Sequence, residues 1–156
     1  MKYTCEVMIN KPRELVVEAY RNTEWLSYWY EGFVSIKPLM RNFGVAGSKA
    51  ILKCEQNGEI SEISAVVESV NEPESVTLRF QMENVWYRAI SELYEDDTEA
   101  MVRTRWVQRI EFHFPGILAI TSLLNKKFYY NNTLRKMNRF KAFVETHDFE
   151  NQRVEE

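Results

Sequence analysis

Few side chains in this 156-residue sequence have the chemistry of a catalytic or metal site. It contains two histidines, His113 and His147, and two cysteines, Cys5 and Cys54, and no CxxC or HxxxH spacing relates them. A zinc site needs three or four such ligands close together, so no metal is expected. With five glycines and no GxGxxG or P-loop motif, nucleotide binding through those motifs is also excluded. We therefore expect no cofactor.

The amino terminus and the absence of long apolar runs bear on location. "MKYTCEVMIN" has no apolar stretch after its lysine, and no apolar run approaches the roughly 20 residues of a membrane span. We expect a mature chain that begins near Met1 and stays in the cytoplasm, with Cys5 and Cys54 as buried, reduced thiols. The length and the 45% hydrophobic content predict one domain over residues 1–146, followed by a frayed tail at 147–156.

The first 32 residues predict a strand and two short helices. "YTCEVMI" alternates polar and apolar residues with the period of a half-buried strand. "NKPRELVVEAYRN" has a proline at the first helical position and an apolar stripe, which predicts an amphipathic helix. Thr23 is expected to cap a second helix, in which Trp25 and Trp29 share a face, and Gly32 is expected to stop it. The tryptophans are expected to be core packing, with Trp29 the one closest to any ligand.

From Phe33 onward, turn sequences separate six strand-like runs and predict an antiparallel meander. Asn57-Gly58 is the strongest hairpin signal, because a type I′ turn needs positive φ at both central positions. Along each run, uncharged residues alternate with residues that carry nearly all the charge. One face of the sheet is therefore expected to be covered and the other to meet water.

The last predicted element is one helix of about 30 residues that opens at Pro115. Its first half is apolar nearly all round, through residues such as Ile117, Leu124 and Phe128, and is expected to be largely buried. Its second half is amphipathic. Residues 115–144 hold six Lys and Arg and no acid, but these charges scatter round the helix.

The order of these elements resembles the START-like superfamily, also called SRPBCC. The similarity spans about residues 2–146 and is carried by "VMINKPRELVVEAYRNTEWLSYW" and "LRKMNRFKAFVE", which resemble the family's opening and closing elements. It implies an α+β helix-grip fold, in which a curved seven-stranded antiparallel sheet wraps a long C-terminal helix. It also implies a cavity for a hydrophobic or amphipathic small molecule, since members include lipid carriers, hormone receptors, quinone-binding proteins and polyketide cyclases.

The inward positions of the sheet determine what such a cavity could hold. Small inward residues, Ala50, Ala65, Ala89 and Ser91, either leave volume unfilled or let the helix approach closely. Both alternatives remain open at this stage. The residues expected to contact a ligand are Trp29, Leu52, Ala65, Phe80, Tyr87, Ser91, Thr104, Trp106, Gln108, Leu124 and Phe128.

Binding is favoured over catalysis, because the inward polar residues are uncharged and poor proton shuttles. The first alternative is a polyketide cyclase or dehydratase, for which His113, just before the long helix, is the weak candidate for a proton donor or acceptor. The second is a non-catalytic protein-interaction module.

Charge distribution leaves a few partners open. Arg103, Arg105 and Arg109 alternate on the outer face near Trp86 and Tyr94, which fits either a homodimer interface or a solvated face. No nucleic acid is expected for an acidic chain without a nucleic-acid motif. Membrane contact is expected to be transient at most.

Overall fold

The structure, a computed structural model, describes residues 1–39, 43–97 and 101–152 and contains one seven-stranded antiparallel sheet. Its strands are β1 (Lys2–Ile9), β2 (Phe33–Pro38), β3 (Lys49–Gln56), β4 (Glu59–Asn71), β5 (Ser75–Met82), β6 (Val85–Asp96) and β7 (Arg103–His113). Their order is β1-β7-β6-β5-β4-β3-β2, so β2 to β7 form a meander and β1 joins its far edge. The six strands predicted after Phe33 are confirmed.

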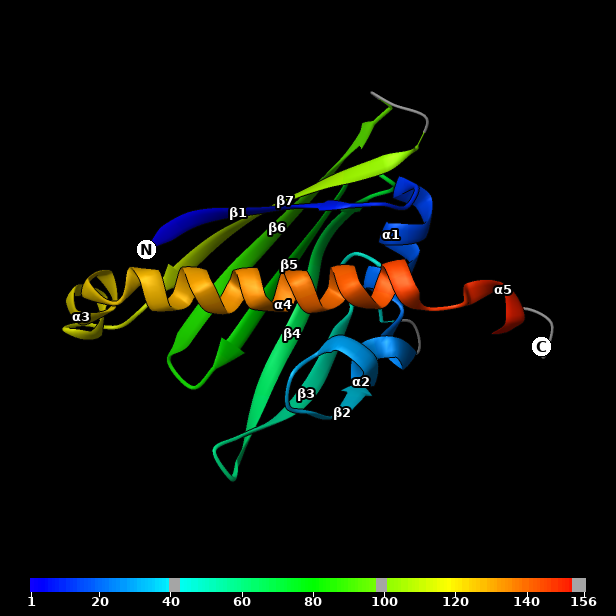
Figure 1. Cartoon of the computed structure of the whole chain (residues 1–156). Coiled ribbons are helices and arrows are strands. Elements are labelled where there is room, and N and C mark those ends of the chain that lie inside the picture. The colour runs from blue at the N-terminus through cyan, green and yellow to red at the C-terminus, as the bar shows by residue number, and fades with distance from the viewer. Residues whose placement is uncertain (40–42, 98–100, 153–156) are drawn as a thin grey trace.

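The helices are α1 (Arg13–Arg21), the 3₁₀ turn η1 (Thr23–Trp25), α2 (Leu26–Trp29), α3 (Leu118–Leu124), α4 (Lys126–Thr146) and α5 (Phe149–Gln152). Helices α1, α2 and α4 lie on one face of this sheet, and α3 lies beyond its end (Figure 1). The long helix α4 crosses the sheet, and α1 and α2 flank its C-terminal half (Figure 1). This is the predicted helix-grip arrangement.

Local sequence signals account for the turns that matter most. Asn57 and Gly58, between β3 and β4, have φ of 54° and 80°, as the predicted type I′ turn requires. Gly32 turns the chain into β2 with φ of 76°, and a Cβ built there would lie 2.3 Å from the Glu55 carbonyl oxygen. Only glycine fits this position, because the backbone of β3 occupies the space of a side chain.

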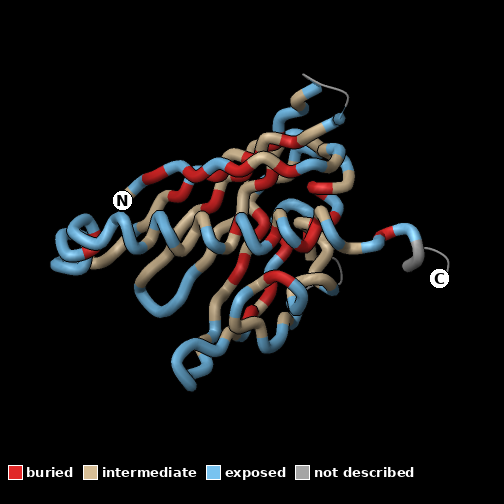
Figure 2. The backbone as a smooth tube through the Cα atoms, viewed as in Figure 1, coloured by how far each residue is buried: buried red, intermediate tan, exposed pale blue. Residues whose placement is uncertain are grey.

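The core lies between the inner face of the sheet and α4, with buried residues alternating along the strands (Figure 2). Phe140 of α4 is fully buried at its centre. Its ring centroid lies 5.0 Å from that of Trp29, 5.1 Å from that of Trp106 and 5.8 Å from that of Tyr20. These edge-on ring contacts hold α2, α4 and β7 together.

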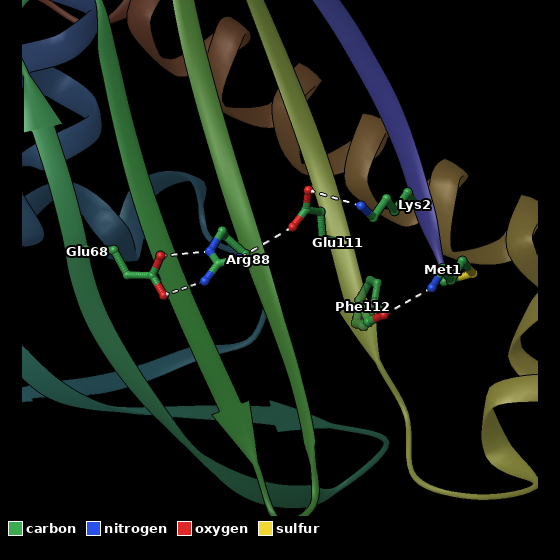
Figure 3. A network of polar contacts seen from close by, with 6 residues as sticks. All are labelled: Met1, Lys2, Glu68, Arg88, Glu111 and Phe112. Atoms are coloured by element: carbon green, nitrogen blue, oxygen red, sulfur yellow. Dashed lines mark hydrogen bonds and ion pairs between the residues drawn. The ribbon is translucent and has the colours of Figure 1, made fainter.

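The outer face of the sheet carries cross-strand ion pairs, as expected of a solvated face. Arg88 donates from Nε to Glu68 at 2.7 Å and from Nη1 to Glu111 at 3.4 Å, and Lys2 Nζ lies 3.7 Å from Glu111 (Figure 3). The ladder joins β4, β6, β7 and β1. Arg105 pairs with Glu6 in the same way, so the outer arginines have partners within the chain.

The predicted single C-terminal helix is wrong in one respect, because it is broken at Asn125. That residue has φ of −105° and ψ of 18°, which ends α3 and lets α4 start in another direction. The prediction that its first half is largely buried is also wrong. Helix α3 lies beyond the end of the sheet, where no strand covers it (Figure 1), and Leu124 is 83% exposed.

Two smaller predictions also differ from the structure. The side chain of Asn22, not Thr23, caps the turn after α1 by accepting a hydrogen bond from the Glu24 N–H at 3.0 Å. The tail predicted to be frayed begins with an ordered turn, in which Phe149 is buried with its ring centroid 4.9 Å from that of Trp25. An apolar aromatic residue within reach of the tryptophan explains why the chain packs here.

Candidate functional site

A cavity of about 400 Å³ lies between the inner face of the sheet and α4. Apolar and aromatic side chains dominate its wall. Eight of the residues predicted to contact a ligand line it, namely Trp29, Leu52, Ala65, Phe80, Tyr87, Trp106, Gln108 and Phe128. The small residues Ala65 and Ala89 both lie in the wall, so the structure combines small inward residues with unfilled volume.

Three other predicted contact residues do not line the cavity. Thr104 is buried where α1 packs on β7, and its hydroxyl donates to the Lys11 carbonyl oxygen at 2.7 Å. Ser91 is also buried, and its Oγ accepts a hydrogen bond from Gln108 at 3.1 Å. Leu124 belongs to α3 and points to solvent. Thr104 and Ser91 face inward as predicted, but other residues lie between them and the cavity.

His113, the weak candidate for proton transfer, lies on the outer face of the sheet. Its ring stacks on Trp86 with 3.7 Å between centroids, and it is exposed. Strand parity explains this, because His113 pairs with Trp86 across β6 and β7 and both side chains point away from α4. The geometry gives it no contact with the cavity.

The most informative lining residue is one that the sequence analysis missed, Lys136 of α4. Its Nζ donates to the Tyr30 hydroxyl at 3.4 Å and lies 4.9 Å from the centre of that ring. A signal for it existed. Tyr129, Thr133, Lys136 and Met137 recur at helical spacing on the face of α4 that lines the cavity. Among six basic residues that scatter round the helix, one lysine on this face does not stand out.

The charge of the cavity wall has one sign. Among the described lining residues, Arg21 and Lys136 are the only charged ones, and none is Asp or Glu. Arg21 is ion-paired with Glu72 and also donates to the Gly44 carbonyl oxygen. Lys136 has no carboxylate within ion-pair distance in the described part of the chain. A half-buried cation without an anion is costly unless something else neutralises it.

The tyrosines of the wall are neutral hydrogen-bonding groups. Burial raises the pKa of Tyr87, Tyr30 and Tyr20 above the ordinary tyrosine value, so their hydroxyls stay protonated. The Tyr20 hydroxyl accepts from Gln108 at 3.4 Å, whereas Tyr30 is held by Lys136. Cys54, next to Tyr30, is half-buried and not buried as predicted, and desolvation raises the pKa of its thiol.

Three residues of the described cavity wall are exposed to solvent, namely Gln56, Met82 and Phe128. Gln56 and Met82 end the strands before two hairpins, and Phe128 is on the first turn of α4. We infer that the cavity meets solvent near these residues, between the hairpin tips and the start of α4, which follows α3.

No group of three or more His, Cys, Asp or Glu residues in the described part of the chain is arranged to hold a metal ion. Nor does any described helix have the length and apolar character needed to cross a membrane.

Comparisons with known proteins identify the fold. No protein-family model and no curated protein sequence matches the chain. Among solved structures, Ara h 8.0201 is 13% identical with a TM-score of 0.68 over 94% of this chain and 99% of that one. The ZhuI aromatase/cyclase from Streptomyces sp. R1128 is 12% identical with a TM-score of 0.68 over 93% of both chains. Ginseng major latex-like protein 151 from Panax ginseng is 15% identical with a TM-score of 0.62 over 92% and 97%.

These similarities cover more than nine tenths of each chain. The chain therefore has the helix-grip fold, as its sequence predicted. At such low identity the match defines the fold. What the cavity holds has to be argued from its own residues.

Proposed function

We propose that this protein binds an amphipathic small molecule whose polar end is acidic, with the apolar body in the cavity and the acidic group beside Lys136. The observation that carries the proposal is the wall itself, which is apolar except for neutral hydroxyls and amides and two cations. A volume of about 400 Å³ falls within the range of sites for small organic ligands.

The polar end is assigned from Lys136 and Tyr30. The ammonium group offers charge, and the Tyr30 hydroxyl, 3.4 Å away, offers a second donor to the same oxygen atoms. A carboxylate or an enolate placed there would supply the anion that the wall lacks. A neutral alcohol of the same length would fill the same apolar volume but leave Lys136 without a counter-charge. Fatty acids, other lipids with an acidic group and acidic aromatic compounds fit this description.

The test compares decanoate with 1-decanol as probes, using tryptophan fluorescence, because Trp29 and Trp106 line the cavity. Decanoate should bind saturably and more tightly than the alcohol. In the Lys136→Met variant, decanoate affinity should fall by at least about tenfold, the loss expected for a hydrogen bond to a charged group, with little change for decanol.

Lys141→Met is the matched control, since Lys141 lies on the same helix but is paired with Glu145 and does not line the cavity. It should bind both probes like the wild type. Equal affinity of the wild type for acid and alcohol would overturn the acidic assignment, and no saturable binding of either would overturn the cavity as a site for such ligands.

The remaining functional expectations stay predictions. The cyclase alternative stays a prediction, since the described wall contains no histidine or carboxylate and its ionisable side chains are tyrosines, Lys136 and Arg21. The homodimer and the cytoplasmic location are likewise predictions from the sequence alone.

A further inference from the structure

Helix α3 has the reverse of the side-chain distribution normal for a surface helix. Six large apolar side chains in and around it are exposed: Ile117, Leu118, Ile120, Leu123, Leu124 and Phe128. Its one buried residue is Ser122, whose hydroxyl donates to the Ala119 carbonyl oxygen at 3.0 Å. A helix in water normally buries its leucines and exposes its serines. Figure 2 shows α3 almost wholly in the colour of exposed residues.

The position of α3 keeps this apolar surface accessible. The helix projects past the end of the sheet at the N-terminal end of α4 and lies chiefly against α4 (Figure 1). Contiguous exposed apolar surface on a folded domain usually marks a place where something binds. The break at Asn125 lets α3 leave the axis of α4, so its leucines are carried away from the core instead of into it.

The charge next to this surface indicates what binds there. Lys126 and Lys127 follow Leu124 after one residue, Asn125. Both lysines are exposed and have no ion pair within the described ranges. Residues 115–144 contain no acid at all. Apolar residues bordered by lysines fit a bilayer with anionic headgroups, because the side chains enter the acyl region while the ammonium groups remain among the phosphates.

A second copy of the chain fits this surface less well. Two α3 helices packed on each other would bring the lysine pairs of both copies together, with no carboxylate in the segment to neutralise them. Like charges placed face to face disfavour such an interface.

The cavity opens next to the same surface. Phe128 belongs to the exposed apolar set and also lines the cavity, one residue after Lys127. A bilayer that received α3 would therefore meet the opening of the cavity across continuous apolar surface. We propose that α3, with Lys126 and Lys127, docks the protein on anionic membranes, and that an amphipathic ligand enters or leaves the cavity there. The docking itself is independent of the proposed cavity ligand, whereas the exchange rests on it.

The test is co-sedimentation of the full chain with vesicles of phosphatidylcholine alone and vesicles that also contain phosphatidylserine. The wild type should bind the anionic vesicles, and raising the salt to about 1 M should weaken binding, because charges are then screened within about 3 Å. The Ile120→Ser/Leu124→Ser and Lys126→Glu/Lys127→Glu variants should each lower the partition coefficient by at least about tenfold.

Two matched controls separate this surface from general effects. Ile60→Ser/Val102→Ser removes two exposed apolar side chains elsewhere, and Lys37→Glu/Lys49→Glu makes the same charge change on β2 and β3. Both should bind anionic vesicles like the wild type. Loss in the controls equal to that in the α3 variants would overturn the assignment to α3.

Two further results would overturn the proposal. One is wild-type protein that does not bind anionic vesicles. The other is a wild-type protein that sediments as a dimer, together with an Ile120→Ser/Leu124→Ser variant that sediments as a monomer. A second copy of the chain would then cover α3 in place of a membrane. The two proposals can fail separately. The Lys136→Met variant should bind decanoate more weakly but bind vesicles like the wild type, and the α3 variants should bind vesicles more weakly but bind decanoate like the wild type.

Discussion

Neighbouring residues of β6, Tyr87 and Arg88, point to opposite sides of the sheet and meet opposite surroundings. Tyr87 lies in the cavity wall, where burial raises its pKa and keeps it neutral. Arg88 lies outside, where the hydrogen bond to Glu68 raises the pKa of Arg88 and lowers that of Glu68. The inner face of the sheet therefore favours the neutral form of a titratable side chain, and the outer face favours the charged form. Lys136 differs from both, because it lies in the apolar wall and has no carboxylate within ion-pair distance among the described residues. The ligand that we propose for the cavity is based on this difference.

The same difference should appear in stability. On the inner face, packing against α4 contributes most of the free energy of unfolding, since large rings are removed from water there. On the outer face, half-exposed ion pairs contribute little each, because water and salt screen them. The variants below test this contrast from the largest expected effect to the smallest.

Phe140→Ala should have the largest effect. It removes a fully buried ring that contacts Tyr20, Trp29 and Trp106 and leaves a cavity, which costs about 3–5 kcal/mol of unfolding free energy. Urea denaturation measures the loss. Phe128→Ala is the control, because this ring on the same helix is 59% exposed and its removal should cost less than about 1 kcal/mol. Similar losses in both variants would contradict the assigned burial of α4.

Tyr3→Phe should have an intermediate effect that depends on pH. The Tyr3 hydroxyl donates to the Tyr129 carbonyl oxygen at 3.2 Å and shares a hydrogen bond of 2.8 Å with Thr133, so the variant should lose about 1 kcal/mol at neutral pH. Burial raises the pKa of Tyr3 from 10.0 to about 12.

The sign of the pH effect follows from that direction. The folded chain holds the Tyr3 proton more tightly than the unfolded chain, so its contribution is complete below about pH 10 and is lost as the pH rises toward 12. Unfolding free energy measured across this window should fall less steeply in Tyr3→Phe than in the wild type. Equal slopes would show that Tyr3 titrates alike in both states.

Glu68→Gln should have the smallest effect and the opposite pH dependence. The hydrogen bond from Arg88 lowers the pKa of Glu68 below its ordinary value of 4.5. The contribution of Glu68 is therefore present above that value and lost as the pH falls through the folded pKa. The variant should lose less than about 1 kcal/mol at neutral pH, and less in high salt. A loss as large as that of Phe140→Ala would break the contrast between the faces.

The sequence predicted the sheet because its signals are local. The alternation of uncharged and charged residues along β3 to β7 predicts which residues face α4. The Asn57-Gly58 pair predicts a turn that needs two positive φ values. The same alternation selected Thr104 and Gln108 alike as ligand contacts, yet only Gln108 lines the cavity. An inward residue contacts either α1 or the open cavity, and which of the two it contacts depends on segments about 90 residues away in sequence. Thr104, for example, is covered by the chain at Lys11, whose carbonyl oxygen accepts its hydrogen bond.

Lys136 and Leu124 show the same limit on the C-terminal segment. Hydropathy predicts that Leu124 is buried, but the structure has it in solvent. In the sequence, Lys136 is only one of six basic residues scattered round the helix, but the structure has it in the cavity wall. By itself, the sequence determined the order of elements, the two faces of the sheet and the helix-grip fold. Only the tertiary structure decided where the sheet ends beneath the last helices. The burial of a helical residue depends on which element packs opposite it, whereas periodicity predicts only which residues share a face of the helix.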